Sequence, residues 1–445
     1  MVGISFGNAL FVMDGAAAIV ALPTIARELG IGAGEATSII IVYQLMLVMV
    51  LLPFANMGDR IGHRTLYQIG QVVYLFATCS VIFVDSFPML LVARAGQALG
   101  AGMALSVSAA MLREIYPARL LGSAMGLNSV VVASSAAIAP TLGGWIVAHF
   151  DWQWVFVAAA PLAVISLGLG RTLPDPFKID REPEILSGIW SAMTFLLVIG
   201  GIQIATHGGA VIGSLLGVMG IISAVLLVMR ERRRSNPVLP VDLLAKPVIG
   251  LSALAAICAF VASGSILISL PFRLEEGFGY TPDEVGLLLL PFPMTMLLVA
   301  PAAGWLSDRI APTKLGVTGM VLAMSGMLLL AFLPDGPTPF DVSWRLSLCA
   351  LGFGLFFAPN SRLLIGQAPR ERSAAAGGLL STSRLVGQAL AAALVGILLT
   401  AQLGLGPWPL VLASGLALVA AACSLARFVT VTRAGGTMAS LRNTD

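Results

Sequence analysis

Charged residues are scarce in this chain. Only 11% of its 445 residues are charged, whereas 58% are hydrophobic and the mean hydropathy is +0.95. A water-soluble domain carries about a quarter charged residues, so this composition excludes a soluble enzyme, a disordered chain and a nucleic-acid-binding protein. The apolar runs are about 20 residues long, whereas the strands of an outer-membrane barrel alternate polar and apolar residues. The sequence therefore predicts an all-α membrane protein.

Metal-ligating and redox residues are also few. The four cysteines stand singly in apolar stretches, and none of the three histidines has a second ligand nearby, so we expect neither a disulfide nor a metal site. A membrane-embedded hydrolase would need a Ser/His or metal cluster at membrane depth, and the sequence has none, so we expect no catalytic residues. It also lacks a glycine-rich phosphate loop. We therefore expect no cofactor, and ATP is not expected as the energy source.

Fourteen apolar runs long enough to cross a bilayer follow one another along the chain. Charged residues, proline and glycine separate them. An even number of spans places both termini on the same side of the membrane. The predicted spans are 4–23, 37–57, 66–84, 88–111, 122–148, 153–171, 186–206, 209–229, 247–271, 284–305, 313–333, 343–365, 374–401 and 408–430.

Basic residues are unevenly distributed between the two sides. With the N-terminus inside, the outer connections hold only Arg27, Arg273 and Arg345, whereas about twenty lysines and arginines fall on the inner side, Arg427 of the inner tail among them. Such a bias sets orientation by the positive-inside rule. We therefore expect a multi-pass protein of the inner (cytoplasmic) membrane with both termini in the cytoplasm.

Two short inner connections resemble each other. Segment 58–64 reads Gly-Asp-Arg-Ile-Gly-His-Arg, and segment 307–314 reads Ser-Asp-Arg-Ile-Ala-Pro-Thr-Lys. Each follows the second span of a set of six, which indicates duplicated halves. We predict an N-terminal six-helix bundle over 1–171, a linker with two extra spans over 172–246, and a C-terminal six-helix bundle with a short tail over 247–445. Transporters with repeated halves commonly bind substrate near the midplane, where the halves meet.

Four motifs on these spans support a family resemblance. They are Asp59-Arg60-x-Gly62-x-Arg64 after the second span, Arg94-x-x-Gln97-x-x-Gly100 in the fourth, Ala139-Pro140-x-x-Gly143-Gly144 in the fifth, and Asp14 followed by Ala21-Leu22-Pro23 in the first. In this order they make the chain resemble the major facilitator superfamily, specifically its fourteen-span drug:proton antiporter branch. The resemblance implies two six-helix bundles with two extra linker helices and transport by alternating access.

Asp14 lies in the middle of the first predicted span. An ionised carboxylate at this depth costs about 2.5 kcal/mol or more. Desolvation favours the neutral form, so this acid can bind and release a proton near neutral pH. A single acid can serve a proton and a cationic substrate only by exchanging them. The alternative is a carboxyl group capped by neighbouring hydroxyl groups or lying nearer the interface.

Two arginines also fall within predicted spans. Arg94 has Gln97 one turn away on the same side of the fourth span. By the family resemblance, both residues act with Asp14 in proton coupling. Alternatively, Arg94 is structural and donates to backbone carbonyls of a neighbouring span. For Arg384 in the thirteenth span, a role in the substrate cavity and a structural role both stay open.

The repeated loop motif has two interpretations. By resemblance, its acid meets a helix N-terminus of the other half and closes an inner gate, and a charge–dipole pair of that kind contributes about 0.3–1 kcal/mol. The alternative is a solvated turn that anchors the topology. The gating residues would be Asp59, Arg60, Gly62 and Arg64, with Asp308 and Arg309 as the second copy.

The motif Ala139, Pro140, Gly143 and Gly144 combines a helix breaker with small residues. Proline removes a helix hydrogen bond and kinks the span, and glycines let a neighbouring helix approach closely. By resemblance, the motif is an antiporter hinge that suppresses leak. The alternative is a plain packing interface.

Aromatic and methionine side chains can form a pliable pocket for apolar compounds. They can equally face lipid or pack inside the protein. Glu275 and Glu276, just beyond the ninth span, form either a cation vestibule or a solvated loop. The candidate residues of the substrate cavity are Asp14, Phe292, Met294, Phe356, Phe357 and Arg384.

These features predict a proton-coupled antiporter that exports amphipathic drugs, dyes or biocides across the cytoplasmic membrane. A proton from outside displaces the substrate from Asp14, and deprotonation toward the inside resets the cycle. The alternative is a dedicated exporter of a single metabolite or natural product on the same fold. We expect the lipid bilayer, protons and a small amphipathic substrate as partners, no nucleic acid, and a monomer.

Overall fold

A computed structural model describes residues 2–116, 118–171, 185–206, 209–232, 241–307, 309–369 and 372–442. Within these ranges every regular element is a helix. Thirteen helical segments are long and apolar enough to cross a membrane, and a shorter apolar segment covers Ser187–Gly201. All fourteen predicted spans coincide with helices, so the prediction of an all-α membrane protein is confirmed.

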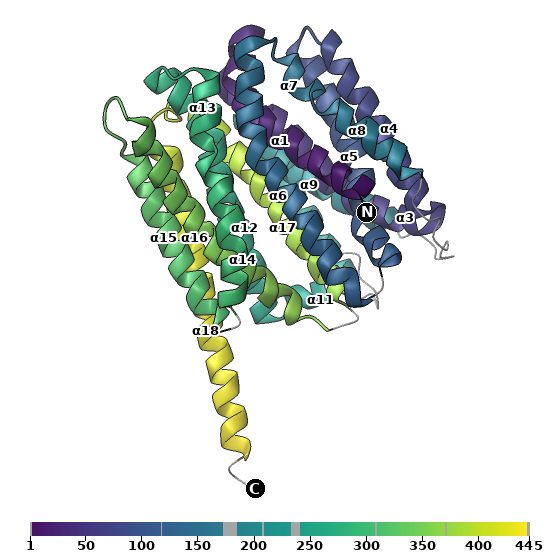
Figure 1. Cartoon of the computed structure of the whole chain (residues 1–445). Helices are drawn as coiled ribbons and strands as arrows, with labels where there is room; N and C mark the ends of the chain where they lie inside the picture. The colour runs from purple at the N-terminus through teal and green to yellow at the C-terminus, as the bar shows by residue number, and fades with distance from the viewer. Residues whose placement is uncertain are drawn as a thin grey trace. The chain divides into compact units, whose positions relative to one another are not determined.

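The chain divides into two units, one comprising Met1–Leu227, Leu267–Pro293 and Ala392–Leu405, the other Val228–Ile266, Met294–Ala391 and Gly406–Asp445. In the first unit, α1 packs against α6 and α8, α3 against α5 and α9, α4 against α5 and α8, and α6 against α13. Figure 1 shows these helices in purple to green. The elements that lie wholly or mostly in this unit are α1 Val2–Leu29, α2 Ala33–Ala36, α3 Ser38–Ile61, α4 His63–Ser80, η1 Val81–Phe83, α5 Phe87–Ile115, α6 Ala118–His149, α7 Gln153–Val157, α8 Ala160–Gly170, α9 Ile185–Thr206, α10 Ala210–Glu231, η2 Arg273–Gly277 and α13 Pro282–Leu289.

In the second unit, α15 packs against both α16 and α18. The last helix, α18, is drawn in yellow in Figure 1 and continues to Arg442. The remaining helices, some of which run from one unit into the other, are α11 Val241–Leu244, α12 Pro247–Phe272, α14 Pro291–Leu306, α15 Pro312–Ala331, α16 Pro339–Gly366, α17 Ser373–Thr400 and α18 Trp408–Arg442. The predicted division at 171 and 247 stays a prediction.

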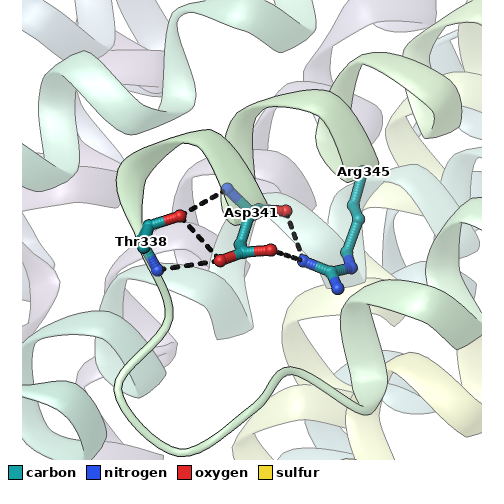
Figure 2. Close-up of polar contacts among 3 residues, drawn as sticks. All are labelled: Thr338, Asp341 and Arg345. Atoms are coloured by element: carbon teal, nitrogen blue, oxygen red, sulfur yellow. Dashed lines mark hydrogen bonds and ion pairs between the residues drawn. The ribbon is translucent and has the colours of Figure 1, made fainter.

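The start of α16 follows from its local sequence. Thr338 is the N-cap, and its hydroxyl oxygen accepts the backbone N–H of Asp341 at 3.2 Å. Asp341 Oδ2 in turn accepts the backbone N–H of Thr338 at 3.1 Å, and Arg345 Nη1 donates to Asp341 Oδ1 at 2.9 Å (Figure 2). This reciprocal capping satisfies backbone donors that the first helical turn leaves unpaired.

A close glycine crossing occurs in both units. A β-carbon at Gly100 on α5 would lie 2.6 Å from the carbonyl oxygen of Gly70 on α4. In the second unit, a β-carbon at Gly319 on α15 would lie 2.6 Å from the carbonyl oxygen of Gly352 on α16. Gly70 and Gly319 follow the two copies of the loop motif at the same spacing. Only glycine permits such a close approach of helix backbones, so the repeat extends from the loops into the packing.

Candidate proton-coupling site

A buried ion pair lies inside the first unit. Arg94 Nη1 on α5 donates to Asp14 Oδ2 on α1 at 2.8 Å, and neither side chain is exposed. A charge is stable at such a position only when it is paired and hydrogen-bonded. Asp14 is therefore directed into the helix bundle, away from lipid and bulk solvent.

The guanidinium of Arg94 has further neighbours. Its Nη1 also donates to Gln97 Oε1 at 2.8 Å, and Gln97 Nε2 donates to Thr78 Oγ1 at 3.0 Å. The rings of Tyr43 and Phe156 lie 4.3 and 5.0 Å from the guanidinium carbon. Aromatic faces attract a cation, so Arg94 is held in place on several sides even when Asp14 changes its charge.

The second oxygen of Asp14 faces a different group. Tyr74 on α4 lies beside the carboxyl group, and its ring contacts Phe11 edge-on with centroids 5.2 Å apart. The Tyr74 hydroxyl lies within reach of this carboxyl group, but neither it nor Asp14 Oδ1 makes a hydrogen bond of good geometry with a described residue. An unsatisfied buried polar atom costs about 1–3 kcal/mol. The site therefore has unused donor and acceptor capacity where a proton on Asp14 would sit.

The structure thus brings together the three residues that the sequence singled out for proton coupling. It adds Tyr43, Tyr74 and Thr78, which sequence analysis missed. A signal for two of them was present, because Tyr74 and Thr78 are polar residues one turn apart in an apolar span, and this spacing places them on one helix face. Tyr43 gave no comparable signal.

The fifth-span motif packs α6 between two other helices. A β-carbon at Gly143 would lie 2.9 Å from the carbonyl oxygen of Ala17 on α1, and one at Gly144 would overlap the carbonyl oxygen of Pro282 on α13. Pro140 and the buried Ala139 belong to the same contact region, because a β-carbon at Gly286 would lie 2.6 Å from the carbonyl oxygen of Pro140. Ala17 is one turn from Asp14, so the motif packs directly on the helix that carries the acid.

The loop motif is described only in part. The side chain of Asp59 and all of Asp308 lie outside the described residues. Arg64 Nη2 donates to the carbonyl oxygen of Arg171 at 2.7 Å. Arg171 caps the C-terminal end of α8, where a positive charge stabilises the helix dipole. Gly62 has φ +100°, a conformation that favours glycine, and it lets α3 end and α4 begin with no intervening loop.

Two other members of the loop motif are surface residues. Arg60 is exposed at the end of α3. The guanidinium of Arg309 lies 3.9 Å from the centre of the Trp305 ring. This cation–π contact holds Arg309 against the end of α14.

The candidate cavity residues occupy different environments. Phe292 is buried in the first unit, and Phe356 is fully buried in the second. Phe357 is half-buried and stacks on Phe260 with centroids 4.4 Å apart, whereas Met294 is exposed. Arg384 is exposed in the middle of the span Ala375–Thr400. Because an arginine at this depth is costly against lipid, the face of α17 that carries it requires polar surroundings.

Glu275 is a buried residue that pairs with an arginine of α1, which the sequence did not predict. The ninth span does not end before it, since α12 continues into a π-helical turn, η2. Glu275 is buried there, and Arg27 Nη1 at the end of α1 donates to its Oε2 at 3.1 Å. Glu276 is among the residues that line a neighbouring cavity of about 650 Å³. Of the two interpretations of these acids, the solvated loop is wrong for Glu275.

Arg427 was counted among the basic residues of the inner tail, and the structure corrects this. Its side chain is buried on α18, where Nη1 donates to Ser252 Oγ at 2.7 Å and to Asn360 Oδ1 at 2.8 Å. Asn360 Nδ2 donates to the carbonyl oxygen of Ser252 at 3.1 Å. Three helices of the second unit therefore meet at this arginine.

Comparison with known proteins agrees with this architecture. The chain is 37% identical over 425 residues to the uncharacterized transporter YebQ of Escherichia coli (strain K12), covering 94% of this chain and 93% of YebQ. It is 28% identical to the multidrug resistance protein Stp of Mycobacterium tuberculosis (strain CDC 1551 / Oshkosh), covering 91% of this chain and 76% of Stp.

The fold is shared with solved transporter structures. A crystal structure of a bacterial homologue of the human lysosomal transporter Spinster superposes with a TM-score of 0.70 at 16% identity, covering 96% of this chain and 95% of that one. The profile of the Major Facilitator Superfamily matches residues 4–186 and 252–438. The chain is thus a multi-pass membrane transporter that belongs to the Major Facilitator Superfamily.

Proposed function

We propose that this transporter is a proton-coupled antiporter of the fourteen-span drug:proton branch, exporting amphipathic drugs, dyes or biocides across the cytoplasmic membrane. The observation that carries the proposal is the fully buried pair of Asp14 and Arg94. The resemblance to the multidrug resistance protein Stp supports the substrate class. The unmatched stretch between the two family segments, 187–251, supports two extra linker helices between the halves.

The pair can couple two fluxes because it has two charge states. When Asp14 is ionised, its attraction to Arg94 holds α1 against α5. When Asp14 takes a proton, that attraction is lost, while Arg94 keeps its bond to Gln97 and its contact with Tyr43. A pair with two stable arrangements can bias a conformational equilibrium. Since the carboxyl group is fully buried here, a proton reaches it only through other buried polar groups or after a change of conformation.

Substrate exchange completes the cycle. We propose that the cargo exchanges with the proton at Asp14 on α1, that Arg384 on α17 contributes to cargo binding, and that Asp59 and Arg60 act as an inner gate. An exposed arginine within the span supports a polar path for cargo. Proton entry from outside displaces the cargo outward, and proton release inside resets the carrier, so the proton gradient supplies the energy and no cofactor takes part. We propose a monomer with both termini in the cytoplasm.

Reconstituted vesicles test the proposal. Ethidium and a panel of dyes and biocides are added to vesicles under a pH gradient, and proton release and dye movement are recorded together. We expect exchange in the wild type and its loss in Asp14→Asn at equal protein content. Asp341→Asn is the matched control, because Asp341 also pairs with an arginine but at a helix end. Undiminished exchange in Asp14→Asn would contradict the mechanism. Exchange with a single compound class would favour a dedicated exporter.

A further inference from the structure

One face of α4 carries a continuous polar stripe through an apolar span. It consists of His63, Tyr67, Gln71, Tyr74 and Thr78, all buried. Their spacings of four, four, three and four residues place them on one helix face, over about 22 Å of helix. Thr78 joins the Asp14–Arg94 site through Gln97, and His63 begins the helix beside the loop motif.

Side chains of the stripe contact successive turns of α1. Tyr67 donates its hydroxyl to the carbonyl oxygen of Gly3 at 3.0 Å and lies 2.8 Å from Ser166 Oγ. At Gly7, one turn further on α1, a β-carbon would overlap the Tyr67 hydroxyl and lie 2.6 Å from Gln71 Nε2. Asp14 lies two turns beyond Gly7 on the same face of α1. The missing side chain at Gly7 therefore leaves room for these polar groups.

Unsatisfied polar atoms follow one another along the stripe. Tyr74 lies within reach of Asp14 and Thr78, and Tyr67 within reach of Gln71, but in the part of the chain that the structure describes, both side-chain heteroatoms of Gln71, the Tyr74 hydroxyl and Asp14 Oδ1 make no hydrogen bond of good geometry. An apolar packing role would not place three such residues in sequence, because each buried polar atom left unpaired destabilises the folded state.

We propose that the polar stripe of α4 conducts the proton between Asp14 and the inner end of the helix at His63, through Tyr74, Gln71, Tyr67 and water bound among them. This inference rests on the proposed proton coupling and adds its route. The positive-inside bias, with Arg60 and Arg64 beside His63, assigns that end to the cytoplasm.

The transfer involves protons only. Neutral Asp14 releases its carboxyl proton from Oδ1 to a water molecule beside Tyr74. At each following oxygen one O–H bond breaks as another forms, and water at the inner end of α4 takes the last proton. The carboxylate that remains pairs with Arg94. Gln71 cannot carry the proton itself, so it is a positioning residue that binds water through both its N–H donors and its carbonyl oxygen.

Other groups face Asp14 and define the competing route. Arg94 approaches it from α5, Tyr43 from α3 and Tyr74 from α4. The Tyr43 hydroxyl and Gln44 Oε1 on α3 also have no hydrogen-bond partner among the described residues. A route along α3 is therefore the alternative that the experiment must separate.

The test measures protonation of Asp14 directly and needs no transported substrate. Purified full-length protein in liposomes is subjected to a pH jump, and the carbonyl stretch of the protonated carboxyl group is followed by infrared difference spectroscopy. The band of Asp14 is the one lost in Asp14→Asn. We expect Gln71→Leu to slow its appearance about tenfold or more, with the midpoint of the titration close to that of the wild type. Tyr74→Phe should slow it to a similar degree. A purely structural role would shift the midpoint or stability without this selective slowing.

The control is Gln68→Leu, the same substitution three residues away on the same helix. Gln68 is half-buried and packs beside Gly170, off the stripe, so we expect the wild-type rate. Should Gln71→Leu fail to fold, the rates of band appearance in Tyr74→Phe and Tyr67→Phe test the route instead. Wild-type rates in these variants, or slowing by Tyr43→Phe alone, would overturn the route and leave the coupling by Asp14 intact. A wild type without any titrating Asp14 band would overturn both.

Discussion

The buried pair of Asp14 and Arg94 predicts a large thermodynamic coupling between two residues 80 positions apart. At 2.8 Å and an effective dielectric constant of about 20, the attraction between the two charges is about 6 kcal/mol. Burial of each ion costs several kcal/mol in return. We therefore expect the pair to contribute little net stability, whereas loss of one partner leaves an uncompensated buried charge and costs about 3–5 kcal/mol.

A double-mutant cycle measures this coupling. Asp14→Asn, Arg94→Met and the double variant are unfolded by SDS in mixed micelles at pH 8, and the free energy of unfolding is obtained from circular dichroism. We expect the double variant to be more stable than the sum of the single losses implies, by about 2–3 kcal/mol. The same cycle on Asp341 and Arg345, a partly exposed pair, is the control and should show much weaker coupling. Additive losses at Asp14 and Arg94 would refute the argument that the two charges compensate each other inside the protein.

Three further predictions concern packing and capping. Gly144→Ala should destabilise the protein strongly, because the new methyl group would meet a backbone carbonyl oxygen of α13. Gly168→Ala should be neutral or stabilising, because a β-carbon there has no heavy atom within 4 Å. Thermal unfolding in detergent compares the two variants. Asn360→Leu should lower the free energy of unfolding by about 1–3 kcal/mol, since it removes a hydrogen-bond acceptor of the buried Arg427, and an unchanged value would contradict this. Thr338→Ala should cost about 1 kcal/mol through the lost cap, measured as faster amide hydrogen exchange confined to the first turn of α16.

The helical fold and the positions of the apolar helices could be predicted from the sequence. Hydropathy is a property of a local window, and a run of about 20 apolar residues has few alternatives to a spanning helix in a bilayer. The same locality explains the boundary error at the ninth span. Its charged residues Arg273, Glu275 and Glu276 predicted an end, but a partner from α1 stabilises the continuation of the helix.

Asp14 could be identified from the sequence as well, because a carboxyl group in the middle of an apolar run is conspicuous and costly. Its surroundings could not be derived in this way. Arg94 was placed beside it by family resemblance, and Tyr43 and Tyr74 were not expected there. Arg427 was assigned to the inner tail, yet it lies among Ser252 and Asn360.

By itself, the sequence determined that this protein is a helical membrane transporter with an acid at membrane depth. The tertiary structure decided which polar groups meet that acid and which lie buried elsewhere. The reason is geometric: a residue's position along an apolar helix sets its depth, but the rotation and crossing of neighbouring helices decide which side chain it faces. Those rotations depend on close contacts such as that of Gly70 with Gly100, which join segments far apart in the chain.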